Sequence, residues 1–171
     1  MSNIYIVGFM GTGKTSAGRE AARRKNWQFV DLDELIELKE KAAIARIFAK
    51  KGEPYFRKAE KRALKEAAAQ KNLMVACGGG IVIDKDNINI MKKTGVIVCL
   101  KASPEVILKR TCLYAHRPLL NVANPKKQIE LLLKLRAPYY AQADRTIDTS
   151  EISVKEAADR IIKVISKSKK C

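Results

Sequence analysis

Short apolar runs alternate along the chain with longer segments in which apolar residues recur every three or four positions. A short continuous apolar run is typical of a buried strand, and the longer period is typical of a helix with one buried face. The runs predict strands at Ile4–Val7, Gln28–Asp31, Leu73–Cys77, Val96–Leu100 and Arg145–Asp148. The periodic segments predict helices at Lys14–Lys25, Ile44–Lys50, Pro54–Ala69, Lys85–Lys93, Pro104–Arg110 and Lys126–Tyr140.

A further helix is predicted near the C-terminus, where a capping box marks its start. Ser153 and Glu156 are three residues apart, so each side chain can accept the backbone N–H of the other residue. The residues that follow trace one apolar face: Val154, Ala157, Ala158, Ile161, Ile162 and Ile165.

Several of the predicted strands are apolar on both faces, as expected for a parallel sheet that helices cover on each side. Strands that alternate with helices predict a three-layer α/β/α fold around a five-stranded parallel sheet. The chain has 171 residues, of which 47% are hydrophobic, and only 5 prolines. This is enough for one well-buried domain and short for two, so we expect residues 1–171 to form a single domain.

A glycine-rich segment, GFMGTGKT at residues 8–15, follows the first predicted strand and precedes the first predicted helix. In that context the pattern Gly8-x-x-x-x-Gly13-Lys14-Thr15 is typical of a phosphate-binding loop. Glycines let successive backbone N–H groups surround an anion, and the helix adds the positive end of its dipole. Lys14 would contact the β- and γ-phosphates, and Thr15 would bind Mg²⁺. The segment predicts binding of ATP or GTP and leaves the phosphoryl acceptor open.

Two carboxylates follow the second predicted strand, in the segment FVDLDELIE. Asp31 closes the strand and Asp33 lies two residues later. Because the carboxyl ends of parallel strands meet at one edge of a sheet, both side chains can face the nucleotide. One could hold the water shell of the metal, and the other could bind and deprotonate an acceptor hydroxyl. Equally, Asp33 could simply cap a helix that begins at Glu34.

Three consecutive glycines, at residues 78–80, follow the third predicted strand. They indicate a second place where backbone must approach a ligand closely. Three arginines, Arg57, Arg117 and Arg136, cannot be assigned from the residues alone. On a chain this basic, a single arginine is more often solvated than functional.

Six short segments, in their order and at their separations, resemble those of shikimate kinases: GFMGTGKT, DLD, FRKAE, CGGG, RPLL and LRAPYY. The resemblance runs from the first strand to at least Tyr140. Many families share the phosphate loop, but GGG together with RPLL and RAPYY is much more specific. The resemblance implies a P-loop kinase fold like that of nucleoside monophosphate kinases, with a short mobile lid at residues 111–124. It also implies that ATP phosphorylates the 3-hydroxyl of shikimate, a step in aromatic amino acid biosynthesis.

The resemblance implies roles for the residues at the acceptor. Asp33 would bind the ring hydroxyls of shikimate and act as the base. Arg57 and Arg136 would bind the carboxylate of shikimate. Gly79 and Gly80 would contribute backbone contacts.

The resemblance implies roles at the donor as well. Thr15 and, through water, Asp31 would hold Mg²⁺. Lys14 and Arg117, the second of them in the lid, would neutralise charge on the transferring phosphoryl group, and Arg110 would lie against the adenine. The complete set of nucleotide-binding residues implied is Gly11, Thr12, Gly13, Lys14, Thr15, Ser16, Arg110 and Arg117.

The chain carries 34 Lys and Arg residues against 18 Asp and Glu residues, a net charge of +16. Such a charge attracts nucleic acid, anionic lipid or small polyanions. The basic residues are spread along the chain and no nucleic-acid-binding motif is recognisable, so we expect no nucleic-acid partner. We also expect the enzyme to be a monomer. Two alternatives stay open: a kinase for another polyol acid such as gluconate, and an ATPase that nucleic acid stimulates.

Cysteine usage and hydropathy indicate the compartment. The 4 cysteines lie far apart, with no CxxC pair and 1 histidine, so we expect no zinc site. No apolar stretch has membrane-spanning length, and the N-terminus lacks the features of a signal peptide. We therefore expect a cytoplasmic protein with no membrane partner.

Overall fold

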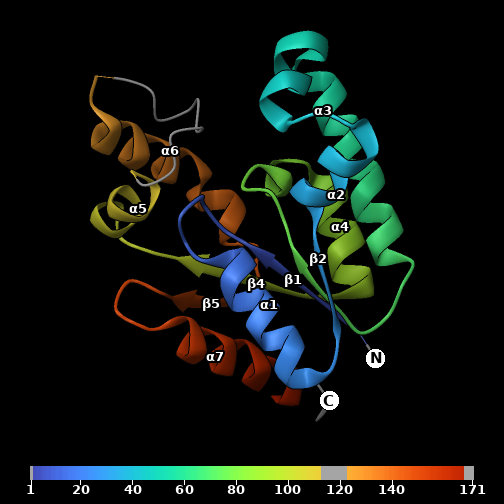
Figure 1. Ribbon diagram of the computed structural model, residues 1–171. Helices are drawn as coiled ribbons and strands as arrows, with labels where there is room; N and C mark the ends of the chain where they lie inside the picture. Colours follow the sequence, from blue (N-terminus) through green and yellow to red (C-terminus); the bar gives the residue numbers. More distant parts are fainter. Residues whose placement is uncertain (1, 113–122, 168–171) are drawn as a thin grey trace.

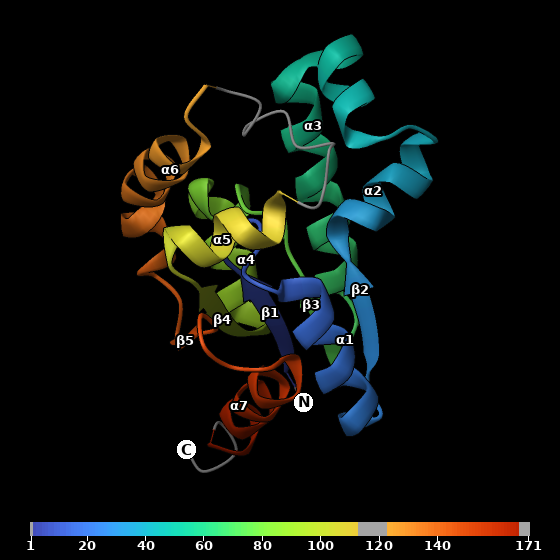
Figure 2. The same ribbon diagram turned by 60° about the vertical axis from the view of Figure 1, so that its left-hand side comes forward.

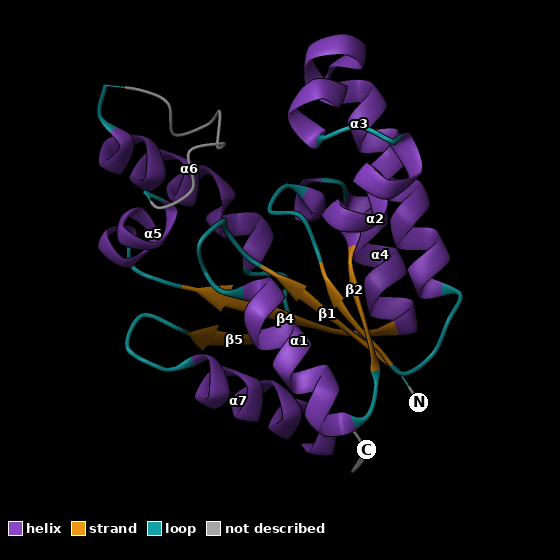
Figure 3. Cartoon of the chain, in the orientation of Figure 1, coloured by secondary structure: helices purple, strands orange, loops and turns teal. Residues whose placement is uncertain are grey.

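Five parallel strands form one sheet at the centre of the molecule (Figure 3). The computed structural model describes residues 2–112 and 123–167. The strands are β1 (Asn3–Val7), β2 (Gln28–Asp31), β3 (Leu73–Ala76), β4 (Gly95–Lys101) and β5 (Arg145–Asp148). They lie in the order β2-β3-β1-β4-β5, and each neighbouring pair is parallel. Their carboxyl ends therefore share one edge, where the connections to the next elements meet.

Helices cover both faces of this sheet (Figure 1). One face carries α1 (Lys14–Lys25) and α7 (Val154–Lys167), and the other carries α3 (Ile44–Ala68) and α4 (Lys85–Thr94). Alternate residues of β1 are buried on opposite sides: Ile4 and Ile6 pack with α1 and α7, whereas Tyr5 and Val7 pack with α3 and α4. The predicted three-layer α/β/α fold is confirmed.

Two further groups of helices extend beyond the carboxyl edge of the sheet (Figures 1 and 2). One consists of α2 (Leu32–Glu40) and the first half of α3, and the other of α5 (Pro104–Thr111) and α6 (Pro125–Tyr140). Phe9, Ala102, Ile107 and Ile129 form a small separate core with α5 and α6. The connections that follow β1 and β3 lie between the two groups.

The helix α3 is bent where the sequence predicts a gap between two helices. Gly52 has φ 79° and ψ 169°, which is outside the helical region, and divides α3 into two helical segments. Pro54 begins the second segment, a position where its missing N–H has no helical partner to lose. The predicted division between Ile44–Lys50 and Pro54–Ala69 is confirmed.

The predicted start of the C-terminal helix is confirmed, and the predicted start of α2 is wrong. The N–H of Ser153 donates to Glu156 Oε2 (2.8 Å), and the N–H of Glu156 donates to Ser153 Oγ (3.2 Å). The cap of α2 is Asp31, whose Oδ1 accepts the N–H groups of Asp33 (3.0 Å) and Glu34 (3.4 Å). Asp33 therefore lies in the first turn of α2, and the alternative that it caps the helix fails because Asp31 already does so.

The predicted lid at residues 111–124 falls mostly on residues 113–122, outside the described residues, and Arg117 lies there too. Thr111 and Cys112, at the end of α5, belong to the described part. None of the helices in the described ranges has the length and apolar character that crossing a membrane requires.

Candidate active site

The phosphate loop, residues 8–15, connects β1 to α1 and is folded by its own hydrogen bonds. The hydroxyl of Thr12 donates to the carbonyl of Phe9 (2.7 Å), and Nζ of Lys14 donates to the same carbonyl (3.0 Å). Gly13 precedes the first residue of α1 with φ 91°, a left-handed conformation that glycine adopts without steric cost. The turn therefore brings the backbone of the loop to the positive end of α1.

A cavity of about 550 Å³ opens at this helix end. Its walls contain the predicted nucleotide-binding residues 11–16, together with Arg110 and the two predicted carboxylates, Asp31 and Asp33. The structure thus brings together every predicted nucleotide-binding residue that lies in the described part of the chain. The remaining lining residues are Met10, Ala17, Cys77, Thr111, Thr149, Ile152, Ser153, Val154 and Ala157.

One wall of this cavity comes from the connection between β5 and α7, which the sequence analysis did not assign to the site. Thr149, Ile152 and Ser153 of this connection line the cavity, together with Val154, the first residue of α7. A signal was available, because β5 is parallel to the other strands and its carboxyl end lies at the same edge. The connection after it therefore had to lie near the phosphate loop.

Arg110 joins this wall to the phosphate loop. Its Nη1 donates to the carbonyl of Gly11 (3.2 Å) and its Nη2 donates to the carbonyl of Thr149 (2.7 Å). The hydroxyl of Thr149, which is buried, donates to the carbonyl of Thr12 (2.9 Å). The guanidinium is thereby fixed at the cavity wall, on the side of the β5–α7 connection.

Thr15 and Asp31 form the candidate metal position. The hydroxyl of Thr15 donates to Oδ2 of Asp31 (2.7 Å), while Oδ1 of Asp31 caps α2. Hydroxyl and carboxylate oxygens are ligands that suit Mg²⁺, which usually keeps water and phosphate oxygens as its other ligands. In residues 2–112 and 123–167 no group of three or more His, Cys, Asp or Glu side chains could hold an ion by itself. The oxygen atoms present fit Mg²⁺ bound together with a nucleotide.

The glycine triplet, residues 78–80, is where three charged side chains converge from three different helices. A Cβ on the first glycine would lie 2.9 Å from Oδ1 of Asp33, which belongs to α2. A Cβ on the second would lie 3.4 Å from Nη1 of Arg136 in α6, and a Cβ on the third 2.6 Å from Nη2 of Arg57 in α3. The triplet therefore leaves room for the three charged residues predicted at the acceptor, and the structure brings them together.

Glu60 is a fourth charged residue at the triplet, and sequence analysis missed it. Its side chain is 1% exposed, and Oε2 accepts a hydrogen bond from Nη1 of Arg57 (2.8 Å). Burial raises the pKa of the Glu60 carboxyl, and the positive charge of Arg57 opposes that rise. Its Oε1 has no hydrogen-bond partner in the described part of the chain. Glu60 follows Arg57 by three residues in FRKAE, a spacing that indicates an ion pair on one helix face. The burial of the Glu60 carboxylate could not be inferred from the sequence.

The phosphate loop and the glycine triplet lie side by side, because they follow the neighbouring strands β1 and β3. A Cβ on the second glycine would lie 3.4 Å from the carbonyl oxygen of Gly8. Asp33 belongs to both places, since it lines the cavity and touches the triplet. The arrangement can hold a phosphorylated donor in the cavity and, next to it, an acidic hydroxylated acceptor between Asp33 and two guanidinium groups.

Comparison with known proteins decides between the families that share this fold. The family model for shikimate kinase matches residues 10–166. The chain is 46% identical to a shikimate kinase of Caldanaerobacter subterraneus subsp. tengcongensis over 169 residues, 99% of each chain. The chain belongs to the shikimate kinase family. The resemblance carried by the six segments is thereby confirmed.

Two solved structures place this shikimate kinase family member among its structural neighbours. A shikimate kinase of Acinetobacter baumannii in complex with shikimate has a TM-score of 0.93 and 39% identity, covering 100% of this chain and 96% of that one. A gluconokinase of Sinorhizobium meliloti has a TM-score of 0.60 and 12% identity, covering 98% of this chain and 94% of that one. The second likeness is one of fold alone, so the gluconate alternative is not favoured.

Proposed function

We propose that the protein transfers the γ-phosphoryl group of ATP to the 3-hydroxyl of shikimate, giving shikimate 3-phosphate. The observation that carries this proposal is the contact between the phosphate loop and the glycine triplet, where Asp33, Arg57 and Arg136 converge. Shikimate is a small hydroxylated ring with one carboxylate. A site that binds it needs cations at one end and, at the other end, a group that accepts a hydrogen bond from its hydroxyls. Membership of a kinase family supports ATP as the donor.

The two arginines suit the carboxylate of the acceptor. A planar guanidinium binds a carboxylate through two parallel hydrogen bonds, which an ammonium group cannot do. Arg57 is already oriented by Glu60 and by Glu53, whose Oε1 accepts a hydrogen bond from its Nη2 (3.0 Å). Arg136 approaches the triplet from α6 on another side. Between them, the backbone of the triplet can contact the ring without interference from side chains.

Asp33 suits the hydroxyl end, because it lies at the boundary between the triplet and the nucleotide cavity. A carboxylate there can accept the proton of the attacking hydroxyl. Lys14, in the phosphate loop, would neutralise charge on the transferring group. The role of Arg117 and the lid at residues 111–124 stay predictions from the family resemblance, as do the single domain, the monomeric state and the cytoplasmic location.

The nucleotide would occupy the cavity with its phosphates at the loop and its base towards Arg110 and the β5–α7 connection. Arg110 is fixed to both loops, so one flat face of its guanidinium can support the adenine. We propose that Thr15 and Asp31 hold Mg²⁺, the second through water. An ion held there would supply positive charge at the phosphates of the nucleotide.

A coupled assay of ADP release tests the proposed function. The full chain with MgATP should release ADP with shikimate and not with gluconate or RNA, and ³¹P NMR should identify the product as the 3-phosphate. The Lys14→Ala variant, which loses the charge at the phosphates, should have no measurable turnover. Turnover of gluconate without turnover of shikimate, or hydrolysis that RNA stimulates, would overturn the proposal.

A further inference from the structure

Tyr140, the last residue of α6, connects that helix to the glycine triplet. Its hydroxyl donates to the carbonyl of Gly79 (2.7 Å), across 61 positions of sequence. Its ring is half-buried between the core of α3 and α4 and the core of α5 and α6. Arg136 lies one helical turn earlier on the same helix, so both side chains lie on the face that approaches Gly79. One hydrogen bond therefore fixes the spacing between α6 and the loop.

The guanidinium of Arg136 and the hydroxyl of Tyr140 approach the same glycine: a Cβ on Gly79 would lie 3.4 Å from Nη1 of Arg136 and 3.6 Å from the hydroxyl oxygen of Tyr140. The nearby positive charge of Arg136 acts to lower the pKa of Tyr140. Burial nevertheless raises the pKa of Tyr140 to about 12, so its hydroxyl keeps its proton over the pH range of enzyme assays. Arg136 and the protonated hydroxyl of Tyr140 thus meet at Gly79, where the hydroxyl donates to the carbonyl.

The two arginines at the triplet are held in different ways. Arg57 is paired with two carboxylates, those of Glu53 and Glu60. Within residues 2–112 and 123–167, Arg136 has no ion pair with a carboxylate, and its guanidinium lies 5.6 Å from the centre of the Phe9 ring. Neutral partners orient a guanidinium without cancelling its charge, so that charge stays available to an anionic ligand.

We propose that Tyr140 is a positioning residue for the acceptor carboxylate: by bonding the end of α6 to the carbonyl of Gly79, its hydroxyl fixes Arg136, one turn earlier on the same helix, at the glycine triplet. This inference rests on the proposed function, because it assigns the carboxylate of shikimate to Arg136. The hydroxyl does not touch the reacting atoms. Its loss should therefore weaken shikimate binding and spare both the chemical step and the nucleotide site.

The test compares two variants of neighbouring tyrosines. Tyr140→Phe removes one oxygen atom and keeps the buried ring, and its KM for shikimate should rise about three- to tenfold, as the loss of one hydrogen bond predicts. Its kcat and its KM for ATP should stay within about twofold of the parent values. Tyr139→Phe, which removes the same atom from an exposed ring, is the matched control and should keep all parent values.

A double-mutant cycle tests whether Tyr140 acts through Arg136. Arg136→Lys alone should raise the KM for shikimate, and adding Tyr140→Phe to it should raise that KM by less than twofold more. If Tyr140→Phe leaves the KM for shikimate unchanged, the inference is overturned, even where the melting temperature falls. It is also overturned if the effects of Tyr140→Phe and Arg136→Lys on that KM multiply. If the parent enzyme does not phosphorylate shikimate at all, the proposed function fails instead, so the two failures are distinguishable.

Discussion

At the scale of single residues, the acceptor site depends on positions that lack side chains as much as on charged ones. Gly80 has φ −97° and ψ −4°, which any residue can adopt, so the backbone does not explain glycine there. The guanidinium of Arg57 explains the glycine, since Nη2 would lie 2.6 Å from a Cβ at that position. A side chain at Gly80 would therefore displace Arg57 from the site while the fold persists.

We predict that Gly80→Ala raises the KM for shikimate by at least about tenfold, because a charge-assisted hydrogen bond to the carboxylate is lost. The melting temperature and the KM for ATP should change little, since Arg57 is a flexible side chain that can move. Steady-state kinetics with each substrate varied in turn measures this. A normal KM for shikimate would show that Arg57 does not bind the acceptor.

Asp33 gives a second prediction at this scale. Asp33→Asn keeps the shape of the side chain but removes the base, so kcat should fall by about two to four orders of magnitude. The secondary structure should persist, because Asp31 and not Asp33 caps α2. Rapid-quench measurement of the chemical step and circular dichroism check the two statements. A kcat near the parent value would leave Asp33 without a role as the base.

The sequence predicted some single residues and not others, for a physical reason. Lys14, Thr15 and Asp31 lie in local patterns whose chemistry follows from spacing along the chain. The burial of Glu60 and the bond from Tyr140 to Gly79 depend on contacts between distant segments, so neither can be inferred from neighbours in sequence.

At the scale of elements, α3 carries a buried carboxylate next to the acceptor site. Burial raises the folded-state pKa of Glu60 above its ordinary value of 4.5, so the folded protein holds that proton more tightly than the unfolded chain does. The free energy of unfolding that Glu60 contributes must therefore fall as the pH rises from about 4.5 through the folded-state pKa. This is the opposite of the usual behaviour of an ion-paired carboxylate.

We predict that the free energy of unfolding of the parent, minus that of Glu60→Gln, decreases as the pH rises from about 4.5 to about 7. Urea unfolding at several pH values measures this difference. Glu53→Gln is the control, because it removes the exposed carboxylate partner of Arg57. It shows how much of the difference comes from loss of an ion pair to Arg57 and how much from the burial of Glu60. A difference that increases with pH would contradict the assignment.

Pattern and turn chemistry predicted the elements well, and the errors lie at their ends. The break in α3 was visible because Gly52 and Pro54 both disfavour a continuous helix. The start of α2 could not be seen in the sequence, because either Asp31 or Asp33 could cap the helix. Which of the two caps it depends on the extended conformation of Asp31.

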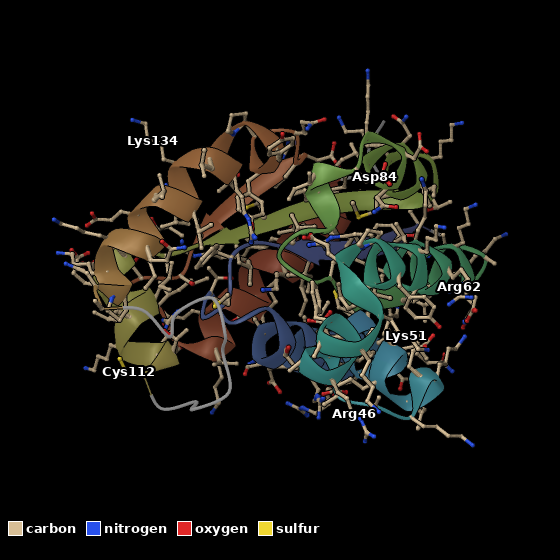
Figure 4. All side chains as sticks on the ribbon, turned by 90° about the horizontal axis from the view of Figure 1, so that it is seen from above. Arg46, Lys51, Arg62, Asp84, Cys112 and Lys134 are labelled. Atoms are coloured by element: carbon tan, nitrogen blue, oxygen red, sulfur yellow. The ribbon has the colours of Figure 1, made fainter. Side chains whose placement is uncertain are left out.

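At the scale of the whole molecule, the protein carries a net positive charge, and its proposed substrates are anions. Figure 4 shows charged side chains around the periphery, with Arg46 and Arg62 in the two segments of α3 and Lys134 on α6. A net charge of +16 should raise the local concentration of anionic substrates. We predict that the KM for ATP rises as the ionic strength increases from about 0.01 M to about 0.15 M. Initial rates at several concentrations of NaCl check this, and a KM that is independent of salt would contradict it.

The architecture follows from the apolar pattern, because strands buried on both faces require helices on each side of a parallel sheet. The site follows from the strand order, because β1, β2 and β3 end next to one another and carry the phosphate loop, Asp31 and the glycine triplet. The approach of α6 to that edge did not follow from the pattern, since it depends on the contact between Tyr140 and Gly79, which are 61 positions apart in sequence.

The most direct test is a crystal structure with shikimate and a non-hydrolysable ATP analogue bound together. We predict that the carboxylate of shikimate lies between Arg57 and Arg136 at the glycine triplet. We also predict that the 3-hydroxyl lies within hydrogen-bonding distance of Asp33 and faces the γ-phosphate. A ring bound away from the triplet, or with its carboxylate towards the phosphate loop, would contradict the account.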